Sequence, residues 1–178
     1  MLPTRVVAVD AVMSETFELE AVEVNLSPLE RFEEFLQSRG KRVTQQRRII
    51  VEHVFAGHEH FDADALVSQV QQQDPHRRVS RPTVYRTLSE LVEAGLLRKM
   101  MLGTRSVYEH DYGYPQHDHL YCQQCEKLIE FHSDEVREIC EAVARQHQFR
   151  VSGHRLIVLG TCPDCARPRR PKRRLDLV

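Results

Sequence analysis

The 178-residue sequence lacks tryptophan and lacks any long uninterrupted run of apolar side chains. A transmembrane helix needs about 20 consecutive, mainly apolar residues, so we expect no membrane span and no membrane partner. The first ten residues, MLPTRVVAVD, lack a sustained apolar stretch, and acidic residues follow soon afterwards, which does not match a secretory signal. We therefore expect a cytoplasmic protein whose thiols stay reduced unless a metal holds them.

The sequence also lacks a large net charge, since its formal charge is −1 at pH 7. The sequence therefore has no overall excess of basic residues that would indicate a nucleic-acid partner. The charges are nevertheless segregated: residues 15–34 are acidic, whereas residues 39–48, residues 76–86 and the tail after Ala166 are basic. Because screening limits the reach of a charge to about 8–10 Å, these local clusters matter more than the sum. No internal repeat has a period that marks a solenoid.

The segment from residue 26 to residue 110 has the signals of short helices followed by a hairpin. Residues suited to N-caps precede apolar residues at helical spacing at Ser27, Thr44, Asp62 and Ser80. Gly40, Gly57, Asp74-Pro75 and Gly95 are suited to end these four helices. Strand candidates follow at residues 96–101 and 106–110. This order is typical of a winged helix, a variant of the helix-turn-helix.

The segment from residue 117 to residue 166 has mixed signals and reads as a small α/β domain. Strand candidates lie at residues 120–121, 127–131 and 155–159, and Ser133 caps a helix candidate that extends to His147. Residues 111–116 contain glycine and proline and are predicted to form a hinge. The sequence thus predicts an α+β fold with an extension at 1–25, a winged helix at 26–110, a hinge at 111–116, an α/β domain at 117–166 and a basic tail at 167–178.

Four of the five cysteines form two Cys-x-x-Cys pairs, and these are Cys122, Cys125, Cys162 and Cys165. Four thiolates are the number that a tetrahedral structural Zn²⁺ requires, so we expect a structural zinc site. The alternative is a pair of redox dithiols, but a thioredoxin-like motif normally occurs once and opens a helix. Cys140 is predicted to be a small helix residue without a special role.

A second set of candidate ligands offers nitrogen and oxygen instead of sulfur. Strand alternation places His117 and His119 on one face and Asp118 on the other. The full set is His60, Glu109, His117, His119 and Glu130. Such a site suits Fe²⁺, Mn²⁺, Co²⁺, Ni²⁺ or Zn²⁺, although a histidine pair in a strand is often only polar surface.

The five predicted ligands come from both sides of the hinge at residues 111–116. A bound ion would therefore fix the angle between the domains and act as a conformational switch. A metalloenzyme is the competing interpretation, but catalysis needs an open coordination position, which five protein ligands do not leave. A further metal site is possible at Asp118 and His154, assisted by Glu135 or Glu138; the alternative there is a set of solvated polar residues.

The helix expected after Ser80 carries the indication of DNA binding. Residues early in a recognition helix meet base edges, and here these positions are Thr83, Tyr85, Arg86 and Ser89. Residues of the basic segment are candidates for phosphate contacts, namely Lys41, Arg42, Arg47 and Arg48. The alternative is that these charges only solvate a helical surface. The basic tail either adds weak DNA attraction or is a solubilising end.

Taken together, these motifs resemble the ferric uptake regulator (Fur) family of bacterial metal-dependent repressors. The resemblance extends from Pro28 to Cys165 and rests on residues 81–88 (RPTVYRTL), His117-Asp118-His119, residues 129–131 and the four paired cysteines. It implies a homodimer with N-terminal winged helices and a C-terminal dimerisation domain. It also implies that the dimer binds double-stranded DNA at a palindromic operator, and represses transcription, when the regulatory metal is present.

The resemblance implies that all five nitrogen and oxygen ligands and all four cysteines match the family's two main metal sites. It departs at the further site, where the family usually has a histidine and a helix glutamate and this chain has Gln116 and Arg137. Members of the family sense iron, zinc, manganese, nickel or peroxide. Peroxide sensors tend to carry aspartates where this chain has Glu109 and Glu130, which favours iron(II). Zinc sensing, and peroxide or thiol redox sensing, remain alternatives.

Overall fold

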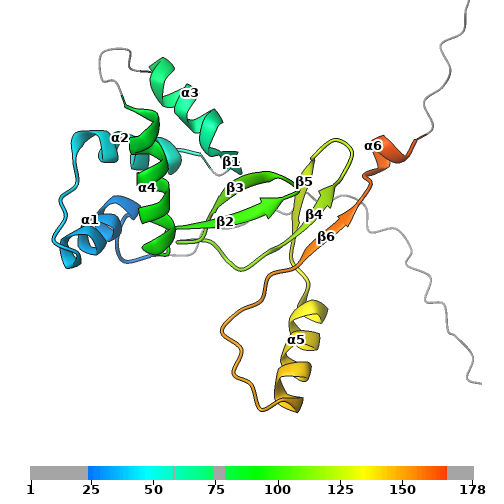
Figure 1. The fold of residues 1–178 in the computed structure, drawn as a ribbon. Coiled ribbons are helices and arrows are strands. Elements are labelled where there is room, and N and C mark those ends of the chain that lie inside the picture. Colours follow the sequence, from blue (N-terminus) through cyan, green and yellow to red (C-terminus); the bar gives the residue numbers. More distant parts are fainter. Residues whose placement is uncertain (1–23, 58, 74–78, 168–178) are drawn as a thin grey trace, which may run out of the picture. The chain divides into compact units, whose positions relative to one another are not determined.

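The computed structural model describes residues 24–57, 59–73 and 79–167 (Figure 1). The chain forms two compact units with a boundary between Pro115 and Gln116, and each is described by itself. Most of the predicted N-terminal extension and basic tail, at residues 1–23 and 168–178, lies outside the described residues, as does the predicted break at Asp74-Pro75. Across the described ranges, no helix is long and apolar enough to cross a membrane.

The first unit contains four helices, and each begins at its predicted N-cap. They are α1 (Pro28–Ser38), α2 (Gln45–Val54), α3 (Ala63–Gln73) and α4 (Arg81–Glu93). Ser27 accepts a hydrogen bond from the Glu30 N–H while the Glu30 carboxylate accepts from the backbone of Ser27, which completes a capping box. The Asp62 carboxylate accepts from the Ala65 N–H at 2.7 Å and caps α3.

The first unit also contains a three-stranded antiparallel sheet in the order β1-β3-β2. Strands β2 (Leu97–Leu102) and β3 (Arg105–His110) form the predicted hairpin, with a shorter loop than expected. Gly103 occupies this loop at a φ of 61°, a conformation that residues with a Cβ rarely adopt. Strand β1 (Phe61–Asp62) was not predicted, because two residues are too few for an alternation of apolar and polar side chains.

The core of the first unit lies where α1, α2, α3 and α4 meet the start of the hairpin. Its most deeply buried side chains come from all of these elements and include Phe32, Leu36, Ile50, Leu66, Val84, Leu88, Leu91, Leu96 and Leu97. The inward face of α4 is therefore formed by Val84, Leu88 and Leu91, whereas Val92 is only partly buried. Burial of this face of α4 leaves the opposite face exposed to solvent.

The second unit contains a three-stranded sheet in the order β5-β4-β6. Strand β4 (Asp118–Cys122) pairs antiparallel with β5 (Leu128–Phe131) and parallel with β6 (Ile157–Gly160). A parallel pair needs a long crossover connection, and helix α5 (Asp134–Gln146) provides it. The short helix α6 (Pro163–Ala166) was not predicted. Helices, a winged hairpin and a small second sheet confirm the predicted α+β fold.

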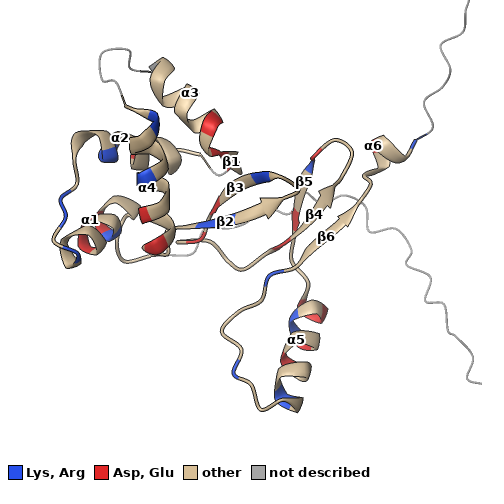
Figure 2. Cartoon of the chain, viewed as in Figure 1, with Lys and Arg blue, Asp and Glu red and all other residues tan. Residues whose placement is uncertain are grey.

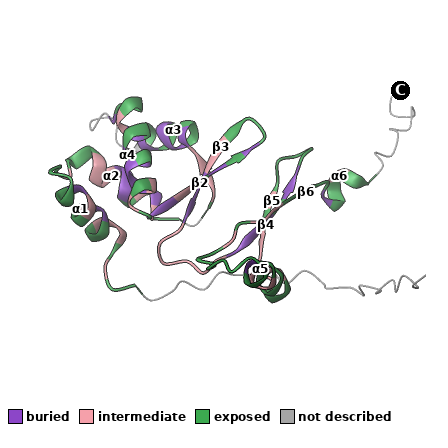
Figure 3. Ribbon diagram, turned by 60° about the horizontal axis from the view of Figure 1, so that its bottom comes forward, coloured by how far each residue is buried: buried purple, intermediate pink, exposed green. Residues whose placement is uncertain are grey.

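Helix α5 is largely exposed to solvent (Figure 3). Ile139 is 64% exposed and Val143 is 50% exposed, and Ala144 is the one residue of α5 that is buried. Leu120, Ile129 and Val158 are Cα partners in neighbouring strands, and each is also exposed. The second unit thus leaves several large apolar side chains of α5 and of its sheet in contact with water.

Candidate functional site

The two Cys-x-x-Cys pairs lie at turns that follow neighbouring strands. Cys122 is the last residue of β4, and the turn back towards β5 carries Cys125. Cys162 follows β6 and is the N-cap residue of α6, which carries Cys165. Because β4 and β6 run parallel, with Cys122 opposite Gly160, both turns lie at the same end of the sheet. Sheet pairing therefore brings together cysteines that are about 40 residues apart in sequence.

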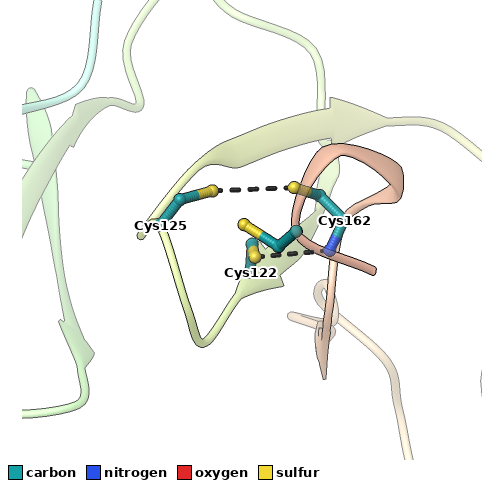
Figure 4. A group of neighbouring side chains, drawn as sticks. Cys122, Cys125 and Cys162 are labelled. Carbon is teal, nitrogen blue, oxygen red and sulfur yellow. Dashed lines mark hydrogen bonds between the residues drawn. The ribbon is translucent and has the colours of Figure 1, made fainter. Parts of the chain in front are cut away.

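The four sulfur atoms lie within 4.8 Å of one another. The sulfur atoms of Cys125 and Cys162 are 3.6 Å apart, and the Cys162 N–H donates to Cys122 Sγ at 3.3 Å (Figure 4). A tetrahedron with Zn–S bonds of about 2.3 Å has edges of about 3.8 Å, so the observed spacing fits a Zn²⁺ ion. All four are free cysteines.

Backbone N–H groups and neighbouring sulfur atoms set the ionisation of this cluster. Hydrogen bonds from the N–H groups of Cys162 and Cys125 lower the pKa of Cys122 to about 6. The pKa of Cys165 is raised to about 12, first by its interaction with Cys125 and then by its interaction with Cys162. Closely spaced thiolates therefore oppose one another's charge, and a bound dication would remove that opposition.

The first unit brings together His60 and Glu109. Phe61 in β1 pairs with Tyr108 in β3, and this antiparallel register places His60 beside Glu109. His60 Nε2 lies 3.4 Å from Glu109 Oε2, and the Glu109 side chain is 4% exposed. A histidine and a buried carboxylate in this arrangement are two ligands that a borderline divalent ion accepts.

The second unit contains His117, His119 and Glu130. The rings of His117 and His119 have centroids 4.9 Å apart, and both side chains are buried. His119 in β4 is the Cα partner of Glu130 in β5. Strand pairing therefore places Glu130 opposite His119, but among the described residues the Glu130 carboxylate joins no group of three metal-capable side chains.

Asp118 and His154 also meet, but with a glutamine instead of a third ligand. His154 Nε2 lies 3.0 Å from Asp118 Oδ2, while the Leu156 N–H donates to Asp118 Oδ1 at 2.9 Å. Gln116 Nε2 lies 2.6 Å from His154 Nδ1. Glu135 instead accepts from the hydroxyl of Ser133. Among the described residues, neither Glu135 nor Glu138 joins this pair in a group of three metal-capable side chains.

The predicted recognition residues lie on the exposed side of α4. Tyr85, Arg86 and Ser89 are exposed, and Thr83 is half-buried. The Tyr85 hydroxyl donates to Asp64 Oδ1 at 2.5 Å, and Arg81 Nη2 lies 2.9 Å from the same oxygen. Figure 2 shows basic and acidic residues along α4. The contacts with Asp64 were not predicted, because an exposed acid on a neighbouring helix has no sequence signature.

Two of the predicted phosphate ligands have an internal partner, Glu90 in α4. Lys41 Nζ and Arg47 Nη2 each lie 2.8 Å from its carboxylate, whose side chain is only 5% exposed. Arg47 also donates to the Arg42 carbonyl at 2.8 Å and is 13% exposed. Arg47 therefore has a structural role that the sequence analysis missed, whereas Arg42 is exposed. The sequence signal for this contact was Glu90 itself, a glutamate at a buried position of α4.

Comparison with known proteins agrees with this architecture. The family model described as "Ferric uptake regulator family" matches residues 38–159. The ferric uptake regulation protein of Campylobacter jejuni is 31% identical over 137 residues, which cover 77% of this chain and 87% of that protein. The peroxide operon regulator of Bacillus subtilis is 31% identical over 134 residues, which cover 75% of this chain and 90% of that protein.

A solved structure has the same fold over most of both chains. The structure of the Helicobacter pylori ferric uptake regulator covers 85% of this chain and 99% of its own, with a TM-score of 0.74 and 23% sequence identity. At that identity the likeness shows the fold alone. The family model and the relatives show more than the fold. This chain belongs to the ferric uptake regulator family, whose members are DNA-binding, dimeric, metal-dependent transcriptional regulators.

Proposed function

We propose that this protein is a cytoplasmic, homodimeric, iron(II)-responsive repressor that binds a palindromic operator and catalyses no reaction. The observation that carries the proposal is the chemistry of the two ligand groups on either side of residues 110–116. His60 and Glu109 lie 3.4 Å apart in the first unit. His117 and His119 lie in the second unit, where Glu130 pairs with His119. Neither group alone offers enough ligands to saturate a divalent ion.

One regulatory ion would complete its coordination by taking ligands from both groups. The short connection between Glu109 and His117 spans at most about 29 Å even when fully extended, so the two groups stay at a high effective concentration. An arrangement that brings both groups to the ion offers it more ligands than an arrangement that keeps the groups apart. This difference in metal contacts between the two states is what a switch requires. An allosteric coupling of about 1–3 kcal/mol is typical and sufficient.

The four-cysteine group would hold a structural Zn²⁺ ion. This assignment is supported by the four sulfur atoms within 4.8 Å of one another at the end of the sheet. A site with four protein ligands leaves no open position, so this ion would neither exchange in sensing nor bind a substrate. It would tie α6 to the β4–β5 turn and stabilise the second unit.

Iron(II) is the regulatory ion that the ligand set and the relatives favour. The Campylobacter jejuni relative is named a ferric uptake regulation protein. Glutamates stand at positions 109 and 130, where the family's peroxide sensors tend to carry aspartates. Nitrogen and oxygen ligands also accept Zn²⁺ and Mn²⁺, so zinc sensing is the closest rival.

DNA recognition is assigned to α4, supported by the exposure of Tyr85, Arg86 and Ser89 along one face. A two-fold dimer of this class reads two half-sites that are about 34 Å, or a multiple of that distance, apart. Metal at the regulatory site would hold the two α4 helices at that spacing. The exposed apolar residues of α5 supply a surface for dimer formation.

Asp118 and His154 are assigned a structural role in this proposal. Their carboxylate and imidazole already bond to each other, and the Leu156 N–H and the Gln116 side chain complete their contacts. Glu135, which was a candidate third ligand, bonds to the Ser133 hydroxyl. The pair therefore offers two ligands in a setting that does not need an ion.

Titration of the zinc-loaded protein with Fe²⁺, Mn²⁺ or Zn²⁺ under anaerobic conditions tests this proposal. Its DNA-binding affinity would be measured by fluorescence anisotropy, on duplexes selected from a random library with the same protein. We expect Fe²⁺ at its cellular concentration range to raise the affinity by about 5- to 150-fold, as an allosteric coupling of ordinary size does. Equal affinity with and without every metal would contradict metal sensing.

A second candidate function is peroxide sensing, because the Bacillus subtilis relative is named a peroxide operon regulator. The same assay separates the two functions. A peroxide sensor would lose DNA binding irreversibly after brief exposure of the Fe²⁺-loaded protein to peroxide, with retention of binding in the Mn²⁺-loaded protein. An iron sensor would recover full affinity when Fe²⁺ is added back under reducing conditions.

A further inference from the structure

One acidic residue lies against the face of α4 that the proposed function assigns to DNA. Asp64 is in the first turn of α3, and α3 packs beside α4 (Figure 1). Its Oδ1 atom accepts the hydroxyl hydrogen of Tyr85 at 2.5 Å and lies 2.9 Å from Arg81 Nη2. Arg81 and Tyr85 are four residues apart in α4 and therefore lie on the same face of that helix.

Stability does not account for this cluster. The side chains of Arg81 and Asp64 are 60% and 61% exposed, and Tyr85 is 41% exposed. Ion pairs with this exposure contribute little to the free energy of folding. A carboxylate at a surface that meets DNA also repels phosphate groups, so its position opposes binding unless it has another use.

We propose that Asp64 determines DNA specificity by occupying Arg81 and Tyr85 until an operator supplies better partners for both. The inference rests on the proposed function, because it requires α4 to face DNA. In this arrangement Asp64 acts as an internal competitor for the DNA. It withdraws one positive charge and one hydroxyl donor from the protein surface in the free state.

The competitor affects the two kinds of DNA complex differently. Non-specific binding depends on contacts between basic side chains and phosphates, and a phosphate competes with Asp64 for the charge of Arg81. An operator offers a base edge for Tyr85 in addition to a phosphate for Arg81. The DNA therefore replaces Asp64 as the partner of both side chains in one event. Base contacts of this kind specify sequence, whereas phosphate contacts only position the protein.

The hydrogen bond also keeps Tyr85 ready to donate. Its acceptor, Asp64, raises the pKa of the Tyr85 hydroxyl above its ordinary value, with smaller contributions in the same direction from desolvation and from the charge of Asp64. Near neutral pH the phenol is protonated already at its ordinary pKa of 10.0, and this shift acts in the same direction. The Asp64 carboxylate also fixes the direction of the Tyr85 ring before DNA arrives, which lowers the ordering cost of the specific complex.

The test uses the full-length, zinc-loaded Asp64→Asn protein at saturating Mn²⁺, a probe that tolerates air. Affinity is measured against a selected operator duplex and a scrambled duplex over a range of salt concentrations. We expect the scrambled duplex to bind about two- to fivefold more tightly, which is the size of effect that an exposed ion pair can have. Its salt slope should steepen by about 0.9 because one more phosphate is contacted, while operator affinity changes less than twofold.

Glu52→Gln is the matched control, because it removes the same charge from an exposed position in α2. Equal gains in Asp64→Asn and Glu52→Gln would overturn the proposal, since net charge would then explain both. Arg81→Gln in the Asp64→Asn background should abolish the gain on scrambled DNA, and persistence of the gain would also overturn it. If the wild-type protein prefers no duplex in the presence of metal, the proposed function itself fails, and this inference fails with it.

Discussion

The carboxylate of Glu90 in α4 lies 2.8 Å from the guanidinium of Arg47 in α2, and both side chains are largely removed from solvent. Lys41, in the connection between α1 and α2, reaches the same carboxylate at 2.8 Å. Helix α4 is thereby tied to α2 and to the connection between α1 and α2. Basic residues that look like phosphate ligands in the sequence therefore hold α4 in place.

Replacing Glu90 with glutamine should destabilise the first unit. The variant keeps the shape of the side chain but leaves Arg47, which is 13% exposed, without its counter-charge. Loss of one partner of a buried ion pair costs up to about 3–5 kcal/mol, and we expect about 2–3 kcal/mol because Lys41 is half exposed. Urea unfolding of the zinc-loaded protein, followed by circular dichroism, measures the change.

Glu93→Gln is the control for this variant, on the same helix and with the same chemistry. Glu93 pairs with Arg39, and both side chains are about half exposed. An exposed pair contributes about 0.2–1 kcal/mol. A cost for Glu90→Gln that is no larger than the cost for Glu93→Gln would contradict the structural role of Glu90.

The cap of α3 should make stability depend on pH in acid solution. Hydrogen bonds, first from the Ala65 N–H, and the neighbouring Arg105 lower the pKa of Asp62 below its ordinary value of 3.8. A depressed carboxyl pKa stabilises the folded state above the unfolded value, and this stabilisation is lost as pH falls through the folded value. Asp62→Ala should therefore cost about 1 kcal/mol at neutral pH, and the difference from wild type should shrink below pH 3.8.

Asp62→Asn separates the charge of this cap from its hydrogen bond. The amide oxygen of asparagine can still accept the Ala65 N–H but does not titrate. Its cost at neutral pH should be smaller than that of alanine. A cost for Asp62→Ala that stays constant from neutral pH to pH 2.5, about one unit below the ordinary aspartate value, would show that the carboxylate charge contributes nothing.

The sequence predicted most of the fold because its helices carry local signals. Ser27 with Glu30, Thr44 and Ser80 mark helix starts through bonds between residues three apart, which any sequence displays directly. The two-residue strand β1 and the four-residue α6 were missed because they are too short for a periodic pattern. They form because longer neighbouring strands and turns hold them.

The four paired cysteines, His117 and His119 were identified as candidate ligands for the same reason, since Cys-x-x-Cys and His-x-His are local patterns. The partners of surface and half-buried charges were not predictable. Asp64 meets Tyr85, and Glu90 meets Arg47, through contacts between residues 21 and 43 positions apart. Gln116 beside His154 is a similar case, at a separation of 38 residues. Tertiary packing alone decides such pairs.

The exposed side chains of α5 should be buried in a dimer. Ile139 is 64% exposed in the protomer, and fully burying such a side chain contributes about 1.5–3 kcal/mol. Ile139→Asn should therefore weaken dimerisation by at least tenfold, because two copies of the residue are affected in a two-fold interface. Sedimentation equilibrium measures the dissociation constant. Arg145→Asn, at a position 71% exposed on the same helix, should leave it unchanged.

Removal of one thiol should release the structural zinc. Cys122 is buried, and its sulfur accepts a hydrogen bond from the Cys162 N–H. Cys122→Ser replaces a thiolate by a hydroxyl that remains protonated, so the zinc content should fall from about one ion per protomer to near zero. The second unit should then unfold at lower temperature. Cys140→Ser, the control on α5, should retain zinc; equal loss from both variants would contradict the assignment.

Loss of a ligand of the regulatory site should remove the response to Fe²⁺ and leave the structural zinc bound. His117 belongs to the second ligand group, and its ring lies beside that of His119 with centroids 4.9 Å apart. His117→Ala removes one nitrogen ligand while the four cysteines remain. We therefore expect a zinc-loaded dimer whose DNA affinity no longer responds to Fe²⁺.

His147→Ala provides the matched control, because His147 is an exposed histidine at the C-terminus of α5. Its variant should keep both the zinc content and the response to Fe²⁺. Metal analysis, sedimentation and anisotropy on the selected duplex together measure zinc, assembly and response for each protein. Loss of zinc or of the dimer in His117→Ala would mean that the two metal sites are not independent. A full response in His117→Ala would remove this residue from the regulatory site, because a lost nitrogen ligand must lower the affinity for the ion.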